Sequence, residues 1–199
     1  IRPTTVVLAG FSSGGDMALG FPSHPGTEEL ELDAVVTFGC NLALETCFAT
    51  RLFARLRPRR DEGLLSELRD FANDAQTIED WLKAHEYLVR VLRKFQAHME
   101  VLQLHARDLV RPFEQGDETT FSEWYRAAST RVKAVRCVFE DSPTCTRLVE
   151  AMRMRNLDHG ILGERYRDDA LIIEPDTRHF DLLSPERFRR HLDEVLELV

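Results

Sequence analysis

Short apolar runs alternate with amphipathic stretches along most of the chain, and this alternation predicts strands and helices in turn. The apolar, β-branched runs that predict strands are residues 4–9, 32–40, 130–139 and 169–174. Helical spacing or a helix-start signal follows each of the first, third and fourth runs. Before the last helix, for example, Ser184 and Pro185 supply a capping hydroxyl and a first-turn proline. This order predicts an α/β fold in which a parallel sheet is flanked by helices.

A long helical pattern interrupts the strands. From Ile78 to Leu102 apolar residues recur every three or four positions with no Gly or Pro between them, and a further helix is expected to begin at Thr120. We therefore predict an all-helical insertion, or cap, at residues 57–129. Residues 1–56 and 130–199 then form the first and second parts of one core. The apolar stripe of the insertion is most simply explained by core packing, with a substrate-facing role as the alternative.

The first predicted strand leads into a turn with a serine at its apex. The residues are Gly10-Phe11-Ser12-Ser13-Gly14, and a small-residue helix start follows them. This G-x-S-x-G spacing between a strand and a helix is typical of a nucleophile elbow, in which strained backbone exposes the serine hydroxyl. The two glycines are expected because a Cβ at either position would collide with the strand or the helix. The alternative is an ordinary turn between a strand and a helix.

Three residues with complementary chemistry each follow a different predicted strand. They are Ser12, Asp141 and His179. Since ligands bind beyond the carboxyl ends of parallel strands, we expect these residues to meet at one edge of the sheet. A serine needs a base to take its proton, and the base needs a carboxylate to fix its tautomer. The neighbouring Glu140 is expected to point to the side of the strand opposite to Asp141, because strand side chains alternate. The alternative role for His179 is to anchor its loop.

The segment VVLAGFSSGG resembles the nucleophile-elbow segment of the α/β-hydrolase superfamily, of an esterase or thioesterase type. The resemblance implies a catalytic triad of Ser12 as nucleophile, Asp141 as acid and His179 as base. It also implies that the backbone N–H of Ser13 stabilises the oxyanion and that Phe11 belongs to the substrate-binding surface.

The resemblance covers only the C-terminal half of such a hydrolase. We therefore expect an N-terminal fragment of the same polypeptide to complete the sheet and to supply the second oxyanion donor. Without it, the uncharged strand at residues 4–9 would be an apolar edge open to pairing with other chains.

Composition narrows the classes of partner. The net charge of −8 argues against nucleic acid and against an anionic membrane surface. No apolar run reaches the roughly 20 residues that span a bilayer. The four cysteines, at positions 40, 47, 137 and 145, have neither disulfide-scaffold nor metal-site spacing. Reduced thiols and a cytoplasmic location are expected, with an oxidised Cys40–Cys47 pair as the alternative. No metal and no cofactor are expected, since no phosphate loop or dinucleotide fingerprint is present.

These observations predict a serine hydrolase that cleaves a carboxylic ester or thioester through an acyl-serine intermediate. Its partner would be a small-molecule acyl substrate, and the aromatic residues of the insertion favour an acyl or aromatic group over a sugar. The alternative is a non-catalytic relative that acts as a binding or assembly module through its helical block. Reaction with a fluorophosphonate would distinguish the two.

Overall fold

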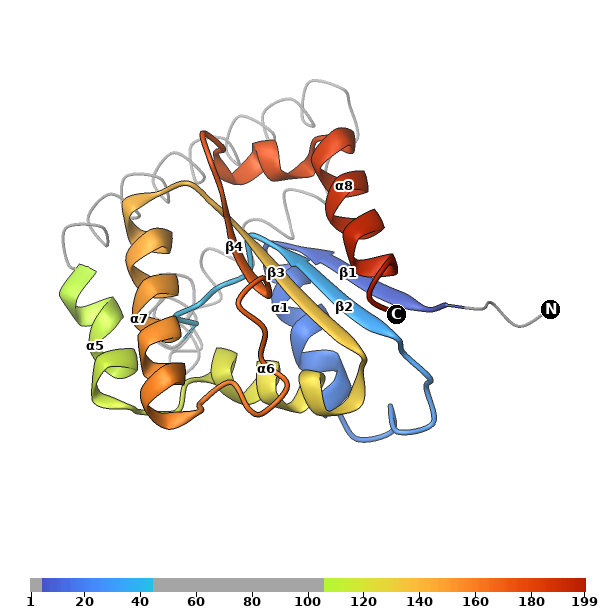
Figure 1. Cartoon of the computed structure of the whole chain (residues 1–199), viewed down its shortest axis with the longest axis horizontal. Coiled ribbons are helices and arrows are strands. Elements are labelled where there is room, and N and C mark those ends of the chain that lie inside the picture. The colour runs from blue at the N-terminus through green and yellow to red at the C-terminus, as the bar shows by residue number, and fades with distance from the viewer. Residues whose placement is uncertain (1–4, 45–105) are drawn as a thin grey trace, which may run out of the picture. The chain divides into compact units, whose positions relative to one another are not determined.

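A parallel β-sheet forms the core of the part of the chain that the structure describes. The structure is a computed structural model that describes residues 5–44 and 106–199. The strands are β1 (Val7–Phe11), β2 (Ala34–Phe38), β3 (Ala134–Glu140) and β4 (Leu171–Glu174). Their order in the sheet is β1-β2-β3-β4 and every neighbouring pair is parallel (Figure 1). The α/β class predicted from the sequence is confirmed.

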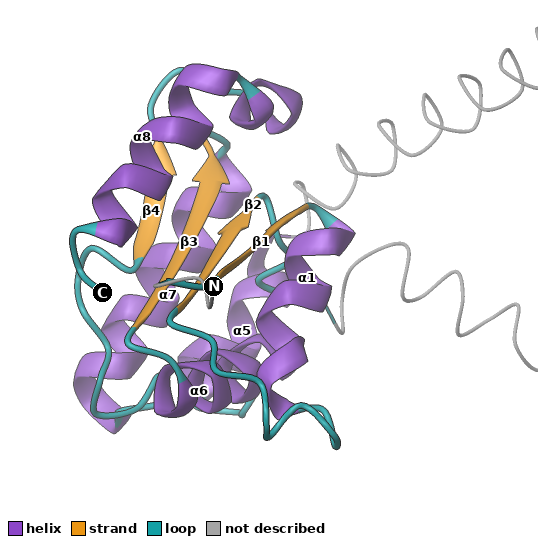
Figure 2. Ribbon diagram, turned by 90° about the vertical axis from the view of Figure 1, so that its right-hand side faces the viewer, coloured by secondary structure: helices purple, strands orange, loops and turns teal. Residues whose placement is uncertain are grey.

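Helices lie on both faces of the sheet. The helices are α1 (Ser13–Gly20), α5 (Ala106–Gln115), α6 (Thr120–Arg131), α7 (Pro143–His159) and α8 (Pro185–Leu196), with short 3-10 helices η1 (Phe21–Ser23) and η2 (His179–Leu183). On one face α1 packs on β1 and β2, α6 on β3 and α7 on β4, while α5 packs against α7. On the other face α8 packs on β2 and β3 (Figure 2).

The alternation of side chains along β2 explains how both faces are filled. All five β2 residues are buried. Val36 and Phe38 belong to the core cluster under α8, which also takes Val138 from β3, Val195 from α8 and Leu182 from η2. The intervening β2 residues point to the α1 face because successive strand side chains alternate. A continuous apolar strand is typical of a sheet that is covered on both sides.

All four described strands start later than their apolar patterns suggest. β1 extends to Phe11 and so reaches the serine turn directly, whereas the sequence predicted a strand over 4–9. β3 begins at Ala134 because Thr130 and Arg131 still belong to α6. The helix starts agree better: Ser184 caps α8 as expected, and α6 begins at Thr120, although the residue that caps it is Thr119, which forms a capping box with Ser122.

The sheet belongs to a unit of residues Ile1–Glu45 and Ala106–Val199, while Thr46–His105 form a second unit. The second unit, including the predicted helix over 78–102, lies outside the described residues. Residues 106–129, which the sequence assigned to the insertion, group with the sheet in the first unit, and α6 packs on β3. The ring of Phe121 lies 6.3 Å from that of Phe139 in β3, and Tyr125 is buried beside it.

β1 pairs with β2 and with no other described strand. Its Ala9 is exposed and its other residues are half-buried. The fragment expected to pair with this edge stays a prediction. Among the described helices none has the length and apolar composition to cross a membrane. The three described cysteines, Cys40, Cys137 and Cys145, are free thiols.

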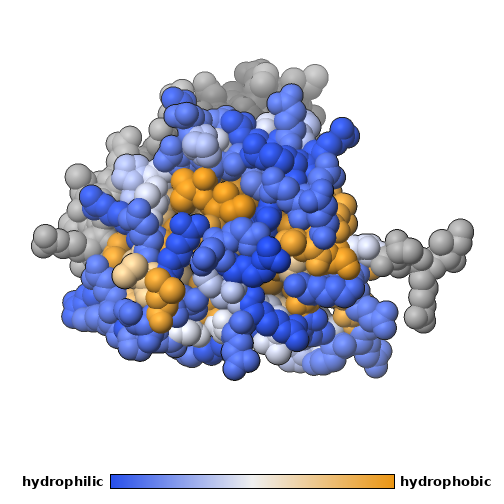
Figure 3. Space-filling model, viewed as in Figure 1, coloured by the Kyte–Doolittle hydropathy of each residue, from blue (hydrophilic) through white to orange (hydrophobic). Residues whose placement is uncertain are grey.

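Ion pairs join α8 to the sheet. The buried guanidinium of Arg136 in β3 pairs with Glu194 of α8 and lies 3.4 Å from Asp169. Glu174, at the end of β4, is buried and pairs with Arg190 and Arg187. On the face that carries β4 and α8, hydrophobic residues show between hydrophilic ones (Figure 3). A buried charge is tolerated only when it is paired, so these contacts fix the position of α8.

His191 of α8 is a buried titratable residue. Its ring is buried, and burial lowers its pKa below the usual 6.5. The charged groups that face it are Glu174, Glu194, Arg190 and Arg136. The unfolded chain therefore binds a proton at His191 at a higher pH than the folded chain, so we expect the contribution of His191 to stability to be full above about pH 6.5 and to fall below it.

We expect the melting temperature to drop by a few degrees between pH 7 and pH 5.5, and His191→Gln to flatten that slope. Thermal unfolding, followed by circular dichroism at each pH, measures the melting temperatures of the wild type and of His191→Gln. His159→Gln, at an exposed histidine, should keep the slope, and an unchanged slope in His191→Gln would contradict the assignment.

Candidate functional site

Ser12 occupies a strained turn between β1 and α1. Its backbone has φ 52° and ψ −125°, a left-handed conformation that costs a non-glycine residue about 1–3 kcal/mol. Hydrogen bonds from both sides hold it there. The Ser12 N–H donates to the carbonyl of Phe38 at 2.7 Å, and the Ser12 carbonyl accepts from the N–H groups of Gly15 at 2.8 Å and Asp16 at 3.1 Å. The sheet and the first turn of α1 together maintain the strain.

The hydroxyl of Ser12 is not used by the fold. Ser12 is the N-cap residue of α1, a position where serine usually accepts a hydrogen bond from the helix. Its side chain makes no such bond and has no hydrogen-bond partner among the described residues. The hydroxyl is therefore available for a ligand.

The glycines around Ser12 differ in what a Cβ atom added at each position would contact. A Cβ at Gly10 would collide with the carbonyl oxygen of Gly14, as expected. A Cβ on Gly14 would meet nothing within 4 Å, so the steric reason expected for this glycine is wrong. The close approach instead involves Gly15, where a Cβ would lie 3.0 Å from Cβ of Cys40. The tight packing of α1 on the loop after β2 thus depends on the residue after the motif.

His179, the first residue of η2, stands beside this turn. Its ring centroid lies 4.8 Å from that of Phe11, the residue that precedes Ser12. The ring also covers Gly39, which has φ 60° and follows β2 directly. A Cβ at Gly39 would lie 2.6 Å from Cε1 and 2.8 Å from Nδ1 of His179, so glycine makes room for the imidazole.

The carboxylate of Glu140 contacts the imidazole of His179 on its Nδ1 side. Nδ1 of His179 donates to Oε2 of Glu140 at 3.1 Å, which leaves Nε2 free to accept a proton. The thiol of Cys145 donates to the other oxygen of Glu140 at 3.4 Å. Burial would raise the pKa of Glu140, but the hydrogen bond and charge of His179 outweigh it and hold that pKa below the usual 4.5. The carboxylate is therefore ionised near neutral pH.

The expectation that Asp141 pairs with His179 is wrong. β3 continues through Glu140, so strand alternation places the Glu140 side chain on the face of Val138, the face that packs against Leu182 of η2. From the same alternation the sequence predicted that Glu140 points away from His179. The sequence does not show against which face of β3 the helix η2 packs. The longer glutamate side chain then reaches the ring.

Asp141 instead braces the loop that carries His179. Its backbone N–H donates to the carbonyl of Thr177 at 2.8 Å, and its exposed carboxylate accepts the N–H of Asp176 at 3.1 Å. Asp176 has φ 54°, the second described non-glycine residue in a left-handed conformation. Within this loop Asp181 accepts the N–H of Arg178 at 3.1 Å. The acidic pair thus has two tasks: Glu140 contacts the imidazole and Asp141 contacts its loop.

A further polar contact, which the sequence did not suggest, joins α1 to the loop after β2. The carboxylate of Asp16 accepts the backbone N–H of Asn41 at 2.7 Å and its side-chain amide at 2.6 Å. Burial is the main reason that the pKa of Asp16 is raised. Gly39 lies two residues before Asn41, so this contact also fixes the backbone beneath His179. A first-turn aspartate looks like an ordinary helix-dipole residue in sequence, and only the fold shows its partner.

The structure brings His179 together with Glu140 and next to the turn of Ser12. It gives no hydrogen bond between the Ser12 hydroxyl and the His179 ring in the described part of the chain; catalytic hydrogen bonds often tighten only when substrate binds. Ser13 is exposed, and its N–H lies in the first turn of α1, where helix N–H groups lack intrahelical partners. Within residues 5–44 and 106–199 no group of three His, Cys, Asp or Glu residues could hold a metal ion.

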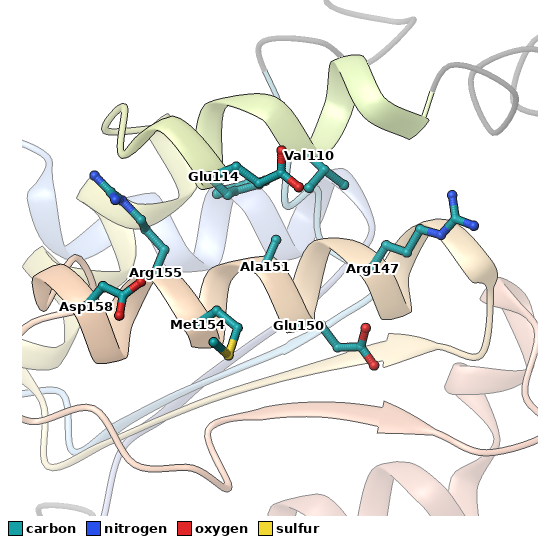
Figure 4. A pocket seen from close by; sticks show the side chains of 9 residues that line it. Val110, Glu114, Arg147, Glu150, Ala151, Met154, Arg155 and Asp158 are labelled. Atoms are coloured by element: carbon teal, nitrogen blue, oxygen red, sulfur yellow. The ribbon is translucent and has the colours of Figure 1, made fainter.

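A separate groove of about 470 Å³ lies between α5 and α7. Its lining is mixed, with Val110 and Met154 among charged residues such as Glu114 and Arg147 (Figure 4). None of the candidate site residues lines this groove, so the serine turn and the groove are distinct features.

Comparisons of the chain with models of protein families, with curated proteins and with solved structures give no match. The functional argument therefore depends on the geometry of the serine turn and of the histidine–glutamate pair.

Proposed function

We propose that this protein is a serine hydrolase that cleaves carboxylic esters or thioesters through an acyl-serine intermediate. The observation that supports the proposal most is the strained Ser12 turn beside an imidazole whose Nδ1 is held by a carboxylate. The chain order Ser12, Glu140, His179 is the order of nucleophile, acid and base in α/β-hydrolases, where the acid is aspartate or glutamate. The proposal thus keeps the nucleophile and base predicted from the sequence and replaces the acid.

Each residue then has a defined task. Nε2 of His179 takes the proton of Ser12 as its oxygen attacks the carbonyl carbon, and returns the proton to the leaving group. Glu140 keeps Nδ1 protonated and stabilises the imidazolium. The N–H of Ser13, at the positive end of α1, donates to the oxyanion. Water activated by the same imidazole then releases the acyl group from Ser12.

Fluorophosphonate labelling tests the proposal directly. We expect one label per chain on the oxygen of Ser12, found by peptide mass spectrometry, and no label in Ser12→Ala. The neighbouring exposed Ser13 is the matched control, and Ser13→Ala should be labelled at the wild-type rate. Folded wild-type protein that takes no label would contradict the hydrolase and support a non-catalytic binding or assembly module.

Gly39 offers a test of the position of His179. Gly39→Ala should lower ester hydrolysis by about 10²-fold, because a 1 Å displacement of a reacting group can cost that much. Gly160→Ala is the matched control: Gly160 has φ 61°, but a Cβ there meets nothing within 4 Å. Both variants lose about 1–2 kcal/mol to the left-handed strain. Equal activity of the two folded variants, measured with p-nitrophenyl acetate, would show that the contact with His179 is unimportant.

A further inference from the structure

Phe180 is an aromatic residue that the fold leaves in solvent. It follows His179 in η2, yet 72% of its surface is exposed. The residue that anchors this short helix is Leu182, which is fully buried in the core under α8. Phe180 therefore adds little to the core, although exposing a phenylalanine side chain forgoes the free energy of its burial.

Three aromatic rings lie next to one another beside the serine turn, two of them apolar phenyl rings. The ring of Phe180 lies edge-on to His179, with centroids 5.5 Å apart and an interplanar angle of 81°. Its centroid is 6.0 Å from that of Phe11, which in turn lies 4.8 Å from His179. Phe11 directly precedes Ser12. The three rings thus extend from the residue before the serine, past the imidazole, to an exposed ring.

We propose that Phe180, together with Phe11, binds an apolar group attached to the carbonyl that Ser12 attacks. The inference rests on the proposed hydrolase function and names its substrate class. Two phenyl rings offer no hydrogen-bond donor or acceptor, so they select a hydrocarbon substituent over a charged or sugar substituent. That hydrocarbon is either the acyl chain or the alcohol of the ester, since both flank the reacting carbonyl.

Two substrate series distinguish whether the bound hydrocarbon is the acyl chain or the alcohol of the ester. The acyl series is p-nitrophenyl acetate, butyrate and hexanoate, and the alcohol series is the acetates of methanol, butanol and hexanol followed by acid release. In one series kcat/KM should rise with chain length in the wild type. Phe180→Ala should reduce the advantage of the six-carbon member over its shortest homologue by about 10-fold, the scale for losing apolar contact with one or two methylene groups.

Two further variants act as controls. Phe180→Leu should retain most of the chain-length preference, because it keeps an apolar side chain. Leu157→Ala, which removes an apolar side chain that is 77% exposed on α7, should leave both series unchanged. Because the ring is exposed, Phe180→Ala should melt within about 2 °C of the wild type.

Three outcomes would overturn the inference. If Phe180→Ala changes short and long members of both series equally, the ring does not bind the substituent, while the hydrolase proposal stands. A large fall in melting temperature would make the ring a structural contact. If the wild type neither hydrolyses any ester nor takes a fluorophosphonate label, the hydrolase proposal fails and this inference fails with it.

Discussion

Ser12→Ala should lower kcat for p-nitrophenyl acetate by about 10³-fold or more, the scale for losing an activated serine. The fold gives the Ser12 hydroxyl no hydrogen-bond partner among the described residues, so its removal should leave the packing of β1 and α1 intact. The measurement is steady-state hydrolysis, with the fold checked by circular dichroism. Unchanged turnover in a folded Ser12→Ala protein would exclude Ser12 as the nucleophile.

The strain at Ser12 sharpens this test. Because φ at Ser12 is 52°, a glycine relieves strain that both serine and alanine must carry. Ser12→Gly should therefore be inactive and yet more stable than the wild type, by about 1 kcal/mol. Chemical denaturation of the wild type, Ser12→Ala and Ser12→Gly measures the difference. A stabilised, inactive glycine variant would show that the serine is kept at the expense of stability, as functional residues often are.

Glu140→Gln should lower kcat by about 10²–10⁴-fold, because an amide at this position no longer favours the tautomer with the proton on Nδ1. Glutamine keeps the shape of the side chain, so the loss would reflect charge and tautomer and not a cavity. The carboxylate should be ionised throughout the neutral range, since its pKa is lowered. Ester hydrolysis measured between pH 6 and 9 checks the expectation.

Asp141→Asn is the matched control one residue away. Asparagine can still accept the N–H of Asp176, so the loop that carries His179 should keep its position and activity should stay within a few-fold of the wild type. Asp141→Ala removes that acceptor and should cost more than Asp141→Asn. The reverse ranking, with Asp141→Asn inactive and Glu140→Gln active, would restore Asp141 as the acid and contradict the observed contact.

Much of the local structure could be predicted from the amino-acid sequence. Apolar runs located four strands, the capping hydroxyl of Ser184 located the start of α8, and the order of elements predicted a parallel sheet. The serine turn could also be found, because a strained turn, a tight glycine and a helix start are properties of adjacent residues. Ser12 was identified for this reason, although the glycine that packs against the β2 loop proved to be Gly15 and not Gly14.

Which side chains meet in the site could not be predicted from the sequence, because it depends on how distant segments pack. Glu140 and Asp141 are adjacent and chemically alike, and the choice between them depends on the face of β3 against which η2 packs. That face is set by the burial of Leu182 in one core cluster with Phe38 of β2 and Val138 of β3, which are far from it in the sequence. In the same way Gly39, Asp16 and Phe180 carried no signal in the sequence, because the role of each depends on where His179 lies in space.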